Sequence, residues 1–182
     1  GLSVGGLPDG TIDADSLASN AVTAGKLASG VGGKVLQAVT VTSGSATFNY
    51  TTTFADSGLS ASITPSATSS KILVMVSQHY VLRRGTGAFG GSLCIFRGST
   101  QITDDINGAD GYKIHMNNNG SGISYYEQQN EWNTTYLDSP NTTSATTYKT
   151  QMRTAWTSSG GPFIGVSNDG TDSYITLLEI GA

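Results

Sequence analysis

The sequence has little charge, a single cysteine and no long apolar run. Charged residues are 12% of the 182 residues, about half the usual share. The lone Cys94 excludes a disulfide framework within the chain, which disfavours a secreted disulfide-bonded adhesin. No apolar stretch approaches the roughly 18 residues of a membrane span, and none has the pattern of a signal peptide. We therefore expect no membrane insertion, and the start at Gly1 leaves open whether further chain precedes it.

Basic residues and histidines are also scarce. The net charge is -4, and Arg83-Arg84 is the one adjacent pair among nine basic residues, so we expect no nucleic-acid partner. The two histidines, His79 and His115, are isolated, and no Ser/His/Asp arrangement is recognisable. A polysaccharide-cleaving enzyme would need two facing carboxylates. The acidic candidates lie mostly in polar stretches, where exposure to solvent is enough to explain them, and we therefore expect no catalytic residues. These candidates are Asp104, Asp105, Asp110, Glu127, Glu131 and Asp138.

Two loops rich in oxygen ligands leave calcium open as an alternative. The first loop contains Asp104, Asp105, Asn107 and Asp110, and the second loop is Asn168–Asp172. Neither has the ligand spacing of a calcium-binding loop, and Asn-Asp-Gly is first of all a turn sequence. His115 would supply three ligands on a threefold axis, but it equally suits a solvent-facing position. We therefore expect no metal and no cofactor.

The first 27 residues contain a regular repeat. Large apolar residues recur every five positions, a period that fits neither an α-helix nor a strand. One such residue in five cannot close a core within a single chain, so it must be buried against copies of itself. The sequence predicts the stalk of a homo-oligomer, followed by a glycine-rich neck that ends at residue 33. The repeating positions are Leu2, Leu7, Ile12, Leu17, Val22 and Leu27.

From residue 34 to 182 the pattern changes to short strands separated by turn residues. The clearest alternation is in 148–154, and Ile72–Val76 is a continuous apolar run typical of a strand buried on both faces. Hairpins are expected around Gly98-Ser99 and between 163–166 and 173–180. About ten strands and no convincing helix predict an all-β, jelly-roll-like antiparallel β-sandwich head domain.

Aromatic and amide side chains are concentrated in one polar stretch. Rings beside amides suit a sugar-binding surface, because they stack on apolar sugar faces while the amides bond hydroxyls. The alternative, that these rings pack the sandwich or a subunit interface, stays open. The candidate glycan-binding residues are Tyr125, Tyr126, Trp132, Asn133 and Tyr136.

The stalk repeats resemble those of bacteriophage tail fibres, particularly from marine and cyanobacterial phages. They are Thr11–Ser19 and Ala21–Ser29, and three further segments resemble terminal domains of such fibres: Ser62–Val74, Tyr136–Tyr148 and Ile175–Ile180. The resemblance implies a trimeric virion fibre or spike whose head contacts a host surface polysaccharide, with other tail or capsid proteins as partners. By strand count the head also resembles the trimeric jelly rolls of the C1q and tumour-necrosis-factor type. A purely structural virion protein and a polysaccharide depolymerase are the alternatives.

Overall fold

The computed structural model of the chain describes residues 22, 34–84, 89–103, 114–116, 126–155, 162–166 and 170–181. The chain divides into two units, Gly1–Lys34 and Val35–Ala182. In the first unit, Val22 is described and is 48% exposed. The other predicted stalk residues lie outside the described part of the chain: Leu2, Leu7, Ile12, Leu17 and Leu27.

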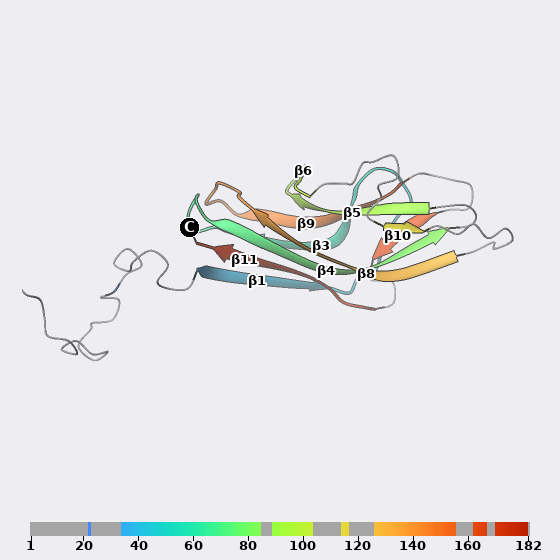
Figure 1. The fold of residues 1–182 in the computed structure, drawn as a ribbon, viewed down its shortest axis with the longest axis horizontal. Coiled ribbons are helices and arrows are strands. Elements are labelled where there is room, and N and C mark those ends of the chain that lie inside the picture. The colour runs from blue at the N-terminus through green and yellow to red at the C-terminus, as the bar shows by residue number, and fades with distance from the viewer. Residues whose placement is uncertain are drawn as a thin grey trace, which may run out of the picture. The chain divides into compact units, whose positions relative to one another are not determined.

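The second unit consists of two antiparallel sheets, which we name sheet A and sheet B (Figure 1). Sheet A contains β1 (Val35–Ser43), β2 (Thr47–Asn49), β4 (Lys71–Arg84), β8 (Tyr126–Asp138), β10 (Phe163–Val166) and β11 (Ser173–Ile180). Sheet B contains β3 (Ala55–Ile63), β5 (Phe89–Arg97), β6 (Thr100–Gln101), β7 (Ile114–Met116) and β9 (Thr146–Thr154). The described residues contain no helix, which confirms the all-β prediction.

Strand β4 is the centre of sheet A. One of its edges pairs with the whole of β8, while the other pairs first with β11 and then with β10. Strand β1 follows β11, and β2 follows β10. In sheet B the order is β3-β9-β5, with β6 and β7 both pairing with β5. Val35 pairs with Ile180, so the last strand is paired within the sheet up to its final residue.

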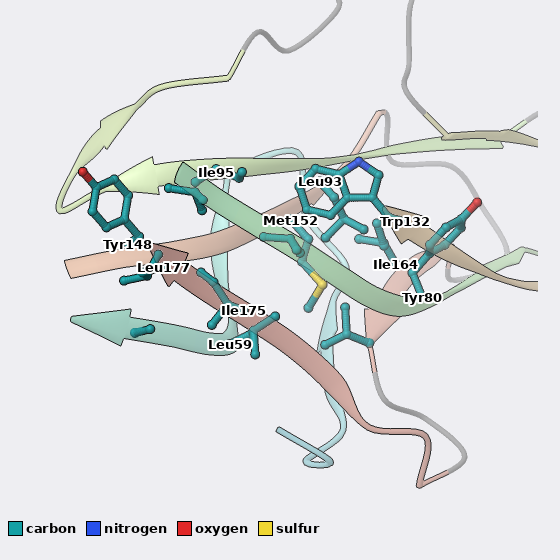
Figure 2. Packing of buried hydrophobic residues seen from close by; sticks show 14 of the residues in the cluster. Leu59, Tyr80, Leu93, Ile95, Trp132, Tyr148, Met152, Ile164, Ile175 and Leu177 are labelled. Atoms are coloured by element: carbon teal, nitrogen blue, oxygen red, sulfur yellow. The ribbon is translucent and has the colours of Figure 1, made fainter. Parts of the chain in front are cut away.

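The core lies between the two sheets and follows from side-chain alternation. In β9, Tyr148, Thr150, Met152 and Thr154 are buried while the residues between them are partly exposed, because successive side chains of a strand point to opposite faces. Strands of both sheets contribute apolar side chains to one continuous cluster (Figure 2). The second unit is therefore β-sandwich-like.

One predicted strand connection differs from the structure. β10 and β11 do not pair as a hairpin: both pair with β4, whose 14 residues are long enough to hold two short strands in succession along one edge. Strand β2 ends after three residues, because the buried Asn49 closes a turn there. Its Oδ1 accepts bonds from the Thr51 N–H and hydroxyl, and its Nδ2 donates to the Met152 carbonyl, an Asx-type interaction that competes with strand pairing.

Candidate functional site

The predicted glycan-binding stretch is a strand, and this divides its residues between two faces. Tyr125 lies outside the described residues, and Tyr126 is the first residue of β8. Trp132 is 9% exposed and belongs to the core, and Tyr136 packs against that core, whereas Asn133 is exposed on the opposite face. Trp132 is drawn among the core side chains in Figure 2. The interpretation of Trp132 as an exposed stacking ring is therefore wrong, because β8 pairs with β4 along its whole length and alternation turns this ring inward.

The other candidate residues are dispersed or undescribed. The oxygen-rich loop from Asp104 to Asp110 lies outside the described residues. Asp138, at the end of β8, accepts bonds from Arg97 and Tyr148. Within the described ranges, no group of three or more His, Cys, Asp or Glu side chains is placed to hold a metal ion. The same ranges contain no helix long and apolar enough to cross a membrane.

The outer face of sheet A, directed away from the core, contains a row of apolar side chains. Cross-strand register aligns Leu137, Leu73, Leu178 and Ala38 in one row across β8, β4, β11 and β1. Leu73 and the neighbouring Met75 are half-buried, not covered on both sides as the sequence predicts for Ile72–Val76. Antiparallel sheets commonly keep one face polar, so a continuous apolar row on the outer face requires a separate explanation.

The exposed large apolar side chains are distributed unequally between the sheets. Among the described residues of the second unit, all six lie on or next to strands of sheet A: Val35, Leu36, Phe48, Tyr50, Leu137 and Tyr174. Strands β3 and β9 of sheet B instead present polar side chains outward, and the neighbouring β5 places the buried Phe96 on the same face. The polar residues are Asp56, Ser60, Ser62, Thr147, Lys149 and Gln151. Clustered exposed apolar residues mark interaction surfaces, whereas scattered ones do not.

A shallow hollow of about 440 Å³ lies in the middle of the sheet A outer face. Its rim includes Tyr174, 45% exposed, together with Asn133 and Met75. Register places Asn133 opposite Ser77 and Ser77 opposite Tyr174, so three strands supply one row of side chains. The hollow combines a ring, an amide, hydroxyls and a thioether.

An aromatic cluster extends the same face toward β2 and β10. The rings of Phe48 and Phe163 are 5.2 Å apart edge to face, and Tyr50 lies 5.3 Å from Phe163. The Arg83 guanidinium lies 5.6 Å from the centre of the Phe163 ring, within cation–π range. Gly165 makes the close packing possible, because a Cβ there would lie 2.5 Å from the Phe48 ring. The sequence gives β2 and β10 no shared signal, so this cluster was not predictable from it.

Glu179 is a buried carboxylate that joins β11, β1 and the loop before β4. Its Oε2 accepts a 2.6 Å bond from Gln37 Nε2, and its Oε1 accepts bonds from the Ser66 N–H at 2.7 Å and the Ser66 hydroxyl at 2.6 Å. Burial alone would raise the pKa of Glu179, but the hydrogen bonds from Ser66 and Gln37 outweigh it and lower the pKa to about 2. The charged form is therefore the one that the fold stabilises.

The lowered pKa of Glu179 predicts a defined pH dependence of stability. A depressed folded-state pKa contributes stability that is full above pH 4.5, the ordinary value, and is lost as the pH falls toward 2. Glu179→Gln should lower the melting temperature by several degrees at pH 7, since charge-assisted bonds of about 1.5–3 kcal/mol are lost. The difference in melting temperature between the wild type and Glu179→Gln should become smaller as the pH falls from 4.5 to 2, as measured by circular dichroism. A difference in melting temperature that stays constant over this pH range would contradict the argument. The matched control is Glu131→Gln, at an exposed position.

The outer faces of the two sheets therefore differ in chemistry. Sheet A has an apolar row and an aromatic cluster, whereas β3 and β9 of sheet B present mainly polar side chains. Comparison with protein-family models finds none that matches the chain, and comparison with curated proteins finds no match either.

Proposed function

We propose that the chain is a homotrimeric fibre or spike component of a phage particle that attaches to a bacterial surface glycan by multivalent, non-covalent binding. The observation that carries the proposal is the concentration of exposed apolar side chains on sheet A. The five-residue repeat in the first unit supports it independently, because its apolar residues require partners from other chains. Other tail or capsid proteins would hold the trimer on the virion.

A jelly-roll-like architecture fits this proposal. Between β3 and β9 the chain crosses from one sheet to the other four times: β3 lies in sheet B, β4 in sheet A, β5 to β7 in sheet B, β8 in sheet A and β9 in sheet B. Such crossing is the connectivity of jelly rolls, where neighbouring strands in a sheet are distant in sequence. The four-strand order β1-β11-β4-β8 then presents one broad face to partner copies.

The sheet A outer face suits a second copy of the chain because apolar groups lie on both sides of the central hollow: the row through Leu73 on one side and the aromatic cluster on the other. The row containing Leu73 and Leu137 and the aromatic cluster around Phe48 would lose contact with water on assembly. Burial of apolar surface contributes about 25 cal/mol per Å². Sheet B, whose strands β3 and β9 present polar side chains outward, would remain outside and face the glycan.

Assembly is tested by the mass of the full chain in solution. Native mass spectrometry should give three times the 18.8 kDa of one chain. Leu137→Asp combined with Leu17→Asp should yield monomers, since each places three unpaired charges in a shared apolar contact, at a cost of several kcal/mol. Thr147→Asp, on the exposed face of sheet B, is the matched control for Leu137→Asp. A wild-type monomer at micromolar concentration would contradict the proposal.

Attachment is tested with the intact chain on an array of bacterial surface glycans and with purified lipopolysaccharide. Three linked sites should give avidity well above the affinity of one, because the second and third binding events become intramolecular. Retention on at least one polysaccharide supports attachment. Shortening of the bound glycan would instead indicate a depolymerase, and a trimer that retains no glycan would indicate a purely structural virion protein.

A further inference from the structure

A second hollow, of about 280 Å³, lies on the outward face of sheet B. Its lining comes from two neighbouring strands, β3 and β9, and combines four polar residues with Gly58 and Leu59. The lining residues are Asp56, Gly58, Leu59, Ser60, Thr147 and Lys149. This volume is below the roughly 300–1,000 Å³ of pockets for drug-sized ligands, so the hollow has room for one sugar unit and not for an extended chain.

An irregularity in β3 creates the hollow. Asp56 pairs with Gln151 and Ser60 with Lys149, so three residues of β3 lie opposite the single Thr150 of β9. Gly58, in the middle, has a φ of +87°, a left-handed conformation that favours glycine. Bulges of this kind locally interrupt the ladder and redirect side chains. Here the bulge separates Asp56 from Ser60 and opens the sheet surface between them.

Buried groups fix the bulge from the inside. Ser57, next to Gly58, is buried and shares a hydrogen bond with Thr150, and its hydroxyl also accepts a 2.9 Å bond from Gln78 Nε2. Leu59, on the other side of Gly58, belongs to the core cluster. The shape of the hollow is therefore set by core contacts, which reduces the entropy lost when a ligand binds.

The polar groups at one end of the hollow are held in place by each other. Lys149 Nζ lies 2.7 Å from Asp56 Oδ1 and 3.0 Å from Oδ2, and Gln151 Nε2 donates a 2.6 Å bond to Oδ1. Burial alone would raise the pKa of Asp56, but the bonds from Lys149 and Gln151 outweigh it and lower that pKa, so the carboxylate stays charged. The Asp56 side chain is still 58% exposed, which leaves its remaining lone pairs accessible. An ammonium has three N–H donors, so Lys149 also keeps one for a ligand.

We propose that this hollow is a subsite for a neutral pyranose with adjacent hydroxyl groups, a specificity that rests on the proposed attachment function. One sugar hydroxyl would donate to the Asp56 carboxylate while its neighbour accepts from Lys149 Nζ. Ser60 and Thr147 supply further hydroxyls at the rim. Asp56 and Lys149 together carry no net charge, and the carboxylate would repel an anionic group placed beside it. The subsite therefore selects neutral sugars over acidic ones.

The test uses the full chain with methyl α-mannoside, methyl α-glucoside and methyl α-galactoside as probes, followed by saturation-transfer NMR. Wild-type protein should transfer saturation to the ring protons of at least one probe, with millimolar affinity expected for a single small site. Asp56→Ala and Lys149→Met should each weaken binding about ten-fold or more, because each removes a hydrogen bond to a charged partner. Asp172→Ala, an exposed carboxylate away from the hollow, should leave binding unchanged.

A second variant separates loss of the site from loss of the fold. Ser60→Phe fills the hollow without removing either charged group, and circular dichroism reports whether the fold is kept. Absence of transfer to all three probes, or equal transfer by wild type and the folded variants, would overturn the subsite. Adsorption to bacterial cells that is unchanged in Asp56→Ala would place recognition elsewhere and leave attachment standing. Sugar binding without any adsorption would contradict attachment and leave the subsite standing.

Discussion

Trp132→Ala is expected to destabilise the head by about 3–5 kcal/mol, the usual cost of removing a large buried aromatic side chain. Trp132 lies in β8 and is 9% exposed within the cluster that both sheets share. Alanine would leave a cavity between the sheets that a close-packed interior fills only in part. For a chain of this length, the melting temperature should fall by roughly 10 °C.

Asn133→Ala is the matched control, because Asn133 is adjacent in the strand and exposed on the other face. It should change the melting temperature by no more than a degree or two. Both are measured by thermal denaturation monitored by circular dichroism, with the oligomer mass checked in parallel. Equal effects of the two variants would show that β8 is not inserted in the sheet as described.

The sequence was least informative for the strand that contains both residues. Strand β8 includes Glu127, Gln128, Gln129, Asn130 and Glu131 in succession, residues that strands usually disfavour. Local pattern therefore suggested a polar surface stretch. Pairing with the whole of β4 overrides that preference, and such long-range pairing leaves no mark in a local window of sequence.

Other parts of the fold were predictable because their signals are local. The alternation in β9 identified its buried face, and Gly98, with a φ of +58°, closes the expected turn between β5 and β6. The hollow at Gly58 was not predictable, since it depends on two extra residues in β3 relative to β9. The apolar outer row was hidden for the same reason, because Leu73, Leu137 and Leu178 are distant in sequence and meet only through register.

A buried polar network connects the end of β8 to sheet B. The Asp138 carboxylate accepts bonds of 2.9 and 2.8 Å from Arg97 Nη1 on β5, and its Oδ2 accepts a 2.7 Å bond from the Tyr148 hydroxyl on β9. Burial, reinforced by the neighbouring carboxylate, raises the pKa of Tyr148 well above its ordinary value, so the phenol keeps its proton as a donor. Among the described residues, this network joins the end of β8 in sheet A to β5 and β9 in sheet B.

Asp138→Ala should cost about 2–4 kcal/mol, because the fully buried Tyr148 hydroxyl is left without its acceptor. The loss from Arg97 is smaller, since its side chain is 32% exposed and water replaces the carboxylate. Tyr148→Phe alone should cost about 1 kcal/mol. The double variant should cost less than the sum of the two single variants. The reason is that Tyr148→Phe removes the same hydroxyl that Asp138→Ala leaves without an acceptor. Urea denaturation of the four proteins measures this coupling, and strictly additive effects would show that Asp138 and Tyr148 act independently of each other.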